Sequence, residues 1–276
     1  MSYIPPDQVA ASMLDSGLAK ARHGTGQLVL RSAVATFLLG AAVLLATTAT
    51  GQTGVGVFGA LLFPMGLVMV ILLGLELLTG NMALVPLAVI ERRATSGQML
   101  RNFGWVLFGH VLGGLLAAFL IAALLTQWWT AEAEPFGLAI AEMAVEKTLG
   151  YQHLGYAGGA GLALLSGILC NGLVSLGVVM GMTSSDTTGK ILAIWFPIAT
   201  FFALGLEHSV VNLFVIPAGM MMGAPVGLDD WWLWNQIPVL IGNLIGALAL
   251  TALPLYFAFA TRGRDSEESA EAETGN

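Results

Sequence analysis

Two copies of one polar motif interrupt apolar stretches of this sequence. The string Gly-Leu-Glu-x4-Asn-x4-Pro begins at Gly74 and again at Gly205, so that Glu76 and Glu207 occupy equivalent places. An unpaired charge inside a bilayer costs at least ~3 kcal/mol on insertion scales, and helix breakers or cap formers follow each glutamate. We therefore expect both helices to break here, with the two glutamates tying the broken backbone to neighbouring helices.

Each break leaves a second half-helix whose N-terminal amides attract anions. His208 directly follows Glu207 and exchanges protons near physiological pH, while Thr79, Asn171 and Asn212 offer neutral hydrogen-bond donors. This combination indicates a site for a small anion. His110 lies between glycines and is more typical of helix packing.

The composition excludes most soluble classes. The 276 residues are 57% hydrophobic and 10% charged, with a mean hydropathy of +0.82, whereas soluble domains carry about 25% charged residues. The one cysteine, Cys170, excludes an intrachain disulfide and a multi-cysteine metal site. No enzymatic centre, cofactor, metal or nucleic-acid partner is indicated, and we expect an all-α integral membrane protein.

The apolar runs predict six membrane spans, because a span needs about 20 apolar residues. They form one transmembrane domain, residues 1–262, which begins with an amphipathic helix and lead-in (1–27); an acidic, disordered tail (263–276) follows. Spans 1–3 resemble spans 4–6 and run in the opposite direction, which predicts an inverted repeat with spans 2 and 5 broken. The predicted spans are 28–49, 55–90, 103–127, 156–182, 190–222 and 232–261.

The basic residues predict the orientation. Nine of the ten lie on the side of the termini, so both ends are expected in the cytoplasm. Lys147 is the exception and is expected on the outer side, on the surface of a helix that also carries Glu142 and Glu146. Two small-x-x-x-small pairs, Gly109 with Gly113 and Gly242 with Gly246, predict close helix packing.

The chain resembles the formate/nitrite transporter family from its N-terminal helix to about residue 260. The resemblance is carried by Glu76-Leu77-Leu78-Thr79-Gly80-Asn81, Gly167-Ile168-Leu169-Cys170-Asn171, Gly205-Leu206-Glu207-His208-Ser209 and Gly242-Asn243.

The resemblance implies an aquaporin-like bundle that assembles as a homopentamer in a bacterial cytoplasmic (inner) membrane. It implies a channel for small monovalent anions such as formate, nitrite or hydrosulfide, with pH dependence and proton coupling through His208. The residues that it places along the pathway are His208, Thr79, Leu78, Asn171, Asn212 and Asn243. It places apolar constrictions at Phe63 and Leu67 on the cytoplasmic side, and at Leu77 and Phe201 on the outer side.

The sequence departs from the family pattern at two points. A lysine usually found near the outer mouth is replaced at the equivalent offset by Gly155, with His153 nearby and Lys147 farther upstream. His110 stands where the family usually has asparagine. Both departures bear on the choice of substrate through the charge along the permeation path, and Lys147, His153 and His110 are the accessory candidates.

Two other classes of channel stay open. An aquaporin-type channel for neutral solutes would ordinarily carry paired Asn-Pro-Ala boxes, which this sequence lacks. An ammonium channel would use paired pore histidines, and His110 together with His208 keeps this alternative open.

Overall fold

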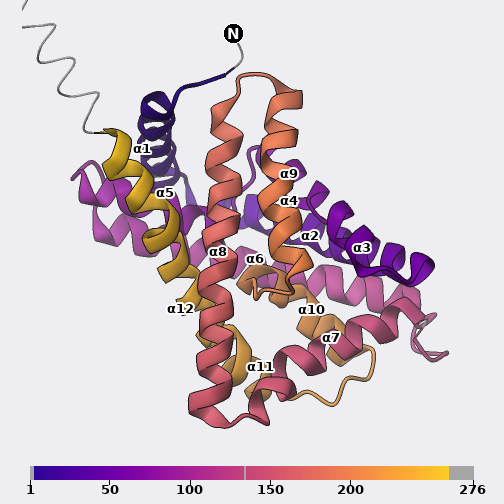
Figure 1. Ribbon diagram of the computed structural model, residues 1–276. Helices are drawn as coiled ribbons and strands as arrows, with labels where there is room; N and C mark the ends of the chain where they lie inside the picture. Colours follow the sequence, from indigo (N-terminus) through magenta and orange to yellow (C-terminus); the bar gives the residue numbers. More distant parts are fainter. Residues whose placement is uncertain (1–2, 134, 261–276) are drawn as a thin grey trace, which may run out of the picture.

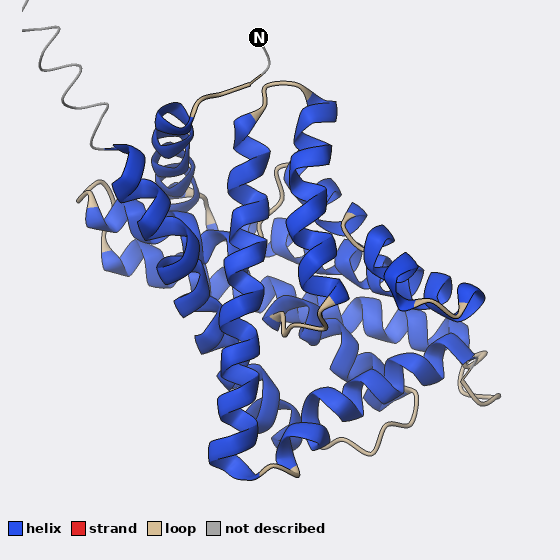
Figure 2. Ribbon diagram, in the orientation of Figure 1, coloured by secondary structure: helices blue, strands red, loops and turns tan. Residues whose placement is uncertain are grey.

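The computed structural model describes residues 3–133 and 135–260, and the predicted acidic tail lies outside them. The described residues are nearly all helical (Figure 2) and include one isolated bridge, between Tyr3 and Ser184, but no strand. The main helices are α1 (Pro6–Arg22), α2 (Thr25–Thr53), α3 (Gly56–Leu62), α4 (Met65–Leu72), α5 (Leu78–Ile90), α6 (Ser96–Leu125), α7 (Pro135–Gln152), α8 (Gly161–Met180), α9 (Thr187–Ala203), α10 (Ser209–Met221), α11 (Leu228–Trp231) and α12 (Ile237–Gly246).

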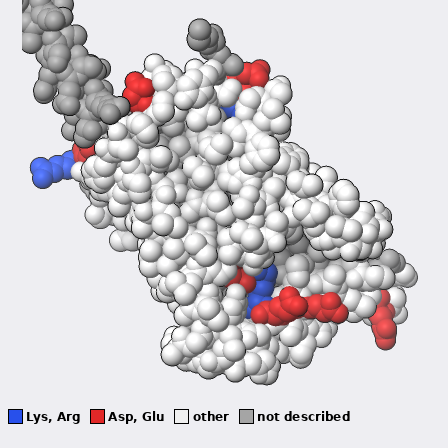
Figure 3. All heavy atoms as spheres, in the orientation of Figure 1, with Lys and Arg blue, Asp and Glu red and all other residues white. Residues whose placement is uncertain are grey.

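Four continuous helical segments are long and apolar enough to cross a membrane. They are Thr25–Thr53, Ser96–Leu125, Tyr156–Thr183 and Leu228–Ala260. Charged side chains gather towards the ends of the molecule and leave a broad uncharged surface between them (Figure 3). Exposed leucine and phenylalanine side chains on α2, α6 and α8 suit contact with lipid. The chain is an integral membrane protein.

The other two apolar segments are interrupted where the repeated motif predicts a break. α4 ends at Leu72 and α5 begins at Leu78; α9 ends at Ala203 and α10 begins at Ser209. Gly74 and Gly205 open the two breaks with φ angles of 62° and 65°, a left-handed conformation that glycine adopts without strain. In each copy of the motif, the glycine therefore lies just after the end of the first half-helix, and the glutamate lies just before the start of the second.

The two half-helices α5 and α10 form the centre of the molecule. All residues of α5 from Leu78 to Ala88, and of α10 from Ser209 to Gly219, are buried. α1 and the helix end at Ala260 lie at one end of the molecule, and α7 and α11 lie at the other (Figure 1). We call these the terminal side and the α7 side.

Glycines hold the long helices close together. A side chain at Gly113 would overlap the backbone of Ala33 on α2, and one at Gly246 would overlap the backbone of Ile168 on α8. Gly109 and Gly242 approach the same partner helices in the same way. The predicted close packing at both glycine pairs is therefore confirmed, and each pair joins equivalent helices of the two repeats.

Candidate functional site

A hydrogen-bonded cluster surrounds the glutamate of the first break. The Glu76 carboxylate is 1% exposed, and its Oε2 atom accepts from Lys20 Nζ at 3.1 Å and from Asn81 Nδ2 at 2.7 Å. Asn81 Nδ2 also donates to Asn102 Oδ1, and Asn102 Nδ2 donates to the Lys20 carbonyl, both at 2.9 Å. The charge of Glu76 is thus paired and hydrogen-bonded, as burial requires.

The second glutamate has the same partners in the same arrangement. Glu207 Oε1 lies 3.1 Å from Lys147 Nζ, and Glu207 Oε2 accepts from Asn212 Nδ2 at 2.8 Å. Asn212 donates to Asn235 Oδ1 at 2.8 Å, and Asn235 donates to the Lys147 carbonyl at 2.9 Å. Tyr151 adds a further hydroxyl donor to Glu207 at 3.1 Å. The repeat therefore extends beyond the predicted spans, because Lys20 on α1 and Lys147 on α7 occupy equivalent places.

This second cluster settles the position of Lys147. Its side chain is 17% exposed and reaches inward to Glu207, whereas Glu142 and Glu146 on the same helix are exposed. The expectation that Lys147 is a surface residue is therefore wrong. The buried Glu207 carboxylate requires a cation, and Lys147 supplies it. His153 is exposed on the α7 side and belongs to neither cluster.

Neutral side chains cap both half-helices. The amide of Leu78, the first residue of α5, donates to His110 Nε2 at 2.9 Å, and His110 Nδ1 lies 3.0 Å from the Ser32 carbonyl. The amide of Ser209, the first residue of α10, donates to Asn243 Oδ1 at 2.9 Å. Since neither cap carries a formal negative charge, the positive potential of the two N-termini is retained.

His208 and Thr79 meet where the two half-helices approach each other. His208 Nδ1 accepts from the Val211 amide at 3.2 Å, so the neutral ring carries its proton on Nε2. Nε2 lies 3.2 Å from Thr79 Oγ1. The imidazole therefore presents a single N–H towards the first half-helix. Its side chain is 3% exposed.

Asn171 links the elements around this contact. Its Nδ2 donates to the carbonyls of Thr79 at 3.2 Å and Asn243 at 2.8 Å, so it holds α5 against α12. Asn212, which is expected along the pathway, has its amide nitrogen engaged by Glu207 and Asn235.

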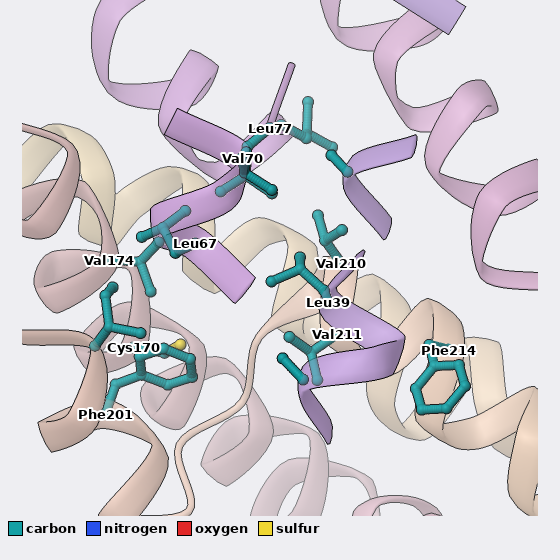
Figure 4. Packing of buried hydrophobic residues seen from close by; sticks show 14 of the residues in the cluster. Leu39, Leu67, Val70, Leu77, Cys170, Val174, Phe201, Val210, Val211 and Phe214 are labelled. Atoms are coloured by element: carbon teal, nitrogen blue, oxygen red, sulfur yellow. The ribbon is translucent and has the colours of Figure 1, made fainter. Parts of the chain in front are cut away.

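An apolar constriction adjoins His208. A space of about 10 Å³, near the smallest that holds one water, is bordered by His208, Phe63 and Leu67 together with Leu39, Leu77, Val174, Ile198, Phe201 and Val211. Figure 4 shows Leu67 beside Val174, and Phe201 near Cys170. Leu78, the first residue of α5, is buried in the same apolar core.

The predicted sides of this constriction are wrong for Phe63 and Leu77. Leu77 and Leu67 both border a larger cavity of about 380 Å³ that opens beside α1, on the terminal side. The Phe63 ring instead packs edge-on against Phe201, with centroids 5.6 Å apart. Leu77 lies nearer the terminal side than Phe63 because the interrupted segment runs towards that side and Leu77 follows Phe63 along it.

The comparison with known families identifies the family of this chain. The sequence profile described as formate/nitrite transporter matches residues 7–257. The chain belongs to the formate/nitrite transporter family.

Curated relatives that belong to this family are similar in sequence to most of this chain. A probable formate transporter of Methanothermobacter thermautotrophicus is 35% identical and shares 74% of each chain. The formate channel BtFdhC of Bacillus thuringiensis is 29% identical over 94% of this chain and 96% of its own. The solved structure of an FNT family ion channel superposes with a TM-score of 0.75 at 24% identity, covering 92% of this chain and 98% of that one. That structural likeness establishes the shared fold.

Sequence reasoning missed several members of the two clusters. Lys20, Asn102 and Asn235 were not singled out, although the two asparagines are also equivalent residues of the repeat. Extending the motif comparison into the third and sixth spans would have found them. The lysines lie on helices of weaker similarity, and no comparable signal marks them.

Proposed function

We propose that this chain is a channel for small monovalent anions of weak acids, such as formate, nitrite or hydrosulfide. The observation that carries this proposal is the position of His208, whose Nε2 meets Thr79 beside the apolar constriction and between the N-termini of two buried half-helices. Relatives named as formate channels or transporters support the same class of substrate.

Electrostatics and apolar walls have separate parts in this function. A small anion that enters the constriction loses water, and the positive ends of α5 and α10 offset part of the cost. Lys20 and Lys147 neutralise the two glutamates that precede these ends, so that the buried acids do not repel the anion. The walls then favour a small solute of low charge.

A proton on His208 gives the channel its pH dependence. Protonation at Nδ1 displaces the hydrogen bond from the Val211 amide and leaves an imidazolium with N–H groups on both nitrogens. The Nε2 proton then passes to an oxygen of the anion, or to the sulfur of hydrosulfide, the neutral acid forms, and the ring is left uncharged with its proton on Nδ1. The acid crosses the apolar walls more readily than its conjugate base does.

The assembly and the membrane setting are part of the same proposal. We infer a homopentamer in a bacterial cytoplasmic membrane, with both termini in the cytoplasm. A pentameric formate channel with formate bound superposes with a TM-score of 0.67 and supports this assembly. The basic residues on the terminal side support the orientation.

Uptake into proteoliposomes tests the proposal. Formate, nitrite, hydrosulfide, lactate and acetate are compared at pH 5.5 and pH 7.5, with electrical recording on the same preparation. Anion current or acid-linked pH change, stronger for the smaller anions, is the expected result. Water or ammonia flux without any anion signal would contradict the proposal and favour the neutral-solute channel.

A further inference from the structure

A second charged site lies outside the His208 constriction. The cavity of about 380 Å³ on the terminal side lies between α1, α2, the break before α5, and α9. Its wall carries Lys20, His23, Arg31, Glu76 and Lys190. The cavity is far larger than the adjoining constriction, so a solute of several heavy atoms fits here before it meets the narrow part.

The charges on this wall do not cancel. Lys20, Arg31 and Lys190 oppose the single carboxylate of Glu76, which leaves two positive charges when His23 is neutral. Glu76 is already held by Lys20 and Asn81. Lys190 forms no ion pair with any residue in the described part of the chain.

We propose that this cavity binds a small divalent anion, such as sulfate, that occupies the entrance without permeating. Arg31 on α2 offers a planar guanidinium suited to two oxygens, and Lys190 on α9 offers an ammonium on the wall of the same cavity. Together they supply the two charges that a dianion needs, without breaking the Lys20–Glu76 pair.

The adjoining constriction explains why such an anion stops here. Leu67 and Leu77 border both the cavity and the space of about 10 Å³ next to His208. Because the Born cost of dehydration grows with the square of the charge, a dianion meets a roughly fourfold larger barrier than formate at the same radius. A bound dianion therefore competes with permeant anions on this side.

His23 makes binding depend on pH. Its Nε2 accepts from Arg31 Nη1 at 3.3 Å and lies 3.6 Å from Glu76 Oε1, with Lys20 close by. Arg101 on α6 donates to the His23 carbonyl. Burial, followed by the nearby cations, lowers the pKa of His23, while Glu76 opposes this shift. A dianion that draws Arg31 away frees Nε2 to take a proton, so binding tightens as pH falls.

Among the described residues, the α7 side carries no matching excess of positive charge. Lys147 faces Glu207 there, and the exposed carboxylates of Glu142 and Glu146 lie on the same helix. Dianion inhibition is therefore expected from the terminal side.

Calorimetric titration of the purified full chain with sodium sulfate tests the site directly, with sodium chloride at matched ionic strength as the reference. Sulfate keeps its double charge across the pH range used. We expect saturable binding that weakens about tenfold in Arg31→Gln and in Lys190→Gln, the loss expected when one close charge is removed. Arg31→Lys, which keeps the charge but not the planar guanidinium, should lose less binding than Arg31→Gln. Arg22→Gln is the matched control, because Arg22 is exposed and does not border the cavity.

Formate flux into proteoliposomes tests from which side of the membrane sulfate acts. Sulfate on the terminal side is expected to inhibit flux, more strongly at pH 6 than at pH 7.5, and sulfate on the other side is expected to have little effect. Absence of saturable sulfate binding, or equal binding by wild type and both glutamine variants, would overturn the proposed site. Because binding is measured without transport, sulfate binding in a chain that fails to conduct formate would contradict only the proposed channel function.

Discussion

His110 Nε2 accepts a 2.9 Å hydrogen bond from the amide of Leu78, at the buried start of the half-helix α5. The equivalent bond in the other repeat uses an asparagine amide oxygen, that of Asn243. A ring nitrogen and an amide oxygen thus perform the same capping task. This equivalence explains why the departure from the family pattern at His110 leaves the break intact.

The first prediction concerns this cap. His110→Asn supplies an acceptor of the type used in the other repeat and should retain both fold and formate flux. His110→Leu leaves the buried Leu78 amide without its acceptor and should lower the free energy of unfolding by about 1–3 kcal/mol. Denaturant unfolding in detergent measures the change, with exposed His153→Leu as the control. Equal stability of His110→Leu and wild type would refute the capping role.

The second prediction concerns the central histidine. His208→Asn retains an oxygen that can accept from the Val211 amide, but it cannot take a proton near neutral pH. The variant should fold, and its formate flux should lose the pH dependence of wild type. Flux measured between pH 5.5 and pH 7.5 checks this, with His110→Asn as a control for exchanging a buried histidine. A His208→Asn variant that keeps the wild-type pH profile would exclude His208 as the proton carrier.

The third prediction concerns the buried ion pair on the α7 side. Lys147→Met leaves the Glu207 carboxylate without its cation and should cost about 3–5 kcal/mol of stability. The double variant Lys147→Met/Glu207→Gln should recover most of that loss, because no unpaired charge remains. Thermal unfolding of wild type, Lys147→Met, Glu207→Gln and the double variant gives the coupling energy. Losses in the double variant equal to the sum of the two single losses would show that Lys147 and Glu207 do not stabilise each other.

Charge reversal tests the same lysine in transport. Lys147→Glu places a second carboxylate beside Glu207 and should weaken anion uptake as well as stability. Uptake is compared at equal amounts of assembled protein, measured by gel filtration. Uptake unchanged by the reversal would mean that Lys147 has no influence on the anion.

The fourth prediction concerns helix packing. Gly246→Val should prevent folding, because the added side chain overlaps the Ile168 backbone and neither helix can retreat. Gly104→Ala on α6 meets no neighbouring atom and should raise stability by about 0.5–1 kcal/mol. Yield of folded protein and its unfolding temperature test both substitutions. A well-folded Gly246→Val chain would contradict the close approach of α12 and α8.

The fifth prediction concerns pH and stability. Burial lowers the pKa of His23 in the folded chain, so the unfolded chain binds more protons as pH falls. The contribution of His23 to stability is therefore complete above its ordinary pKa, near 6.5, and is lost as pH falls below it. Unfolding from pH 7.5 to 5 should show a smaller acid-induced loss in His23→Gln than in wild type. Parallel profiles would show that His23 is not the responsible group.

Some features were predictable because they depend on local chemistry. Glycine and glutamate inside apolar runs mark a break, and the repeated spacing marks it twice, so both interruptions lie where the motif predicts them. The glycine pairs were predictable for the same reason, since small residues at helical spacing favour close helix contact.

Other features depend on which distant segments meet. The inward turn of Lys147 requires Glu207 to lie opposite α7, and nothing near Lys147 in the sequence encodes that contact. The sides of Leu77 and Phe63 depend on chain direction across the break. Family resemblance alone did not supply that geometry.

The contact between Thr79 and His208 joins the first half of the chain to the second. Around it there is room for about one water, less than formate occupies. A passing solute must therefore separate Thr79 from His208, which is a contact between the two halves of the chain. Conduction and stability then depend on the same contact. Substitutions that strengthen this contact should slow transport even when they make the protein harder to unfold.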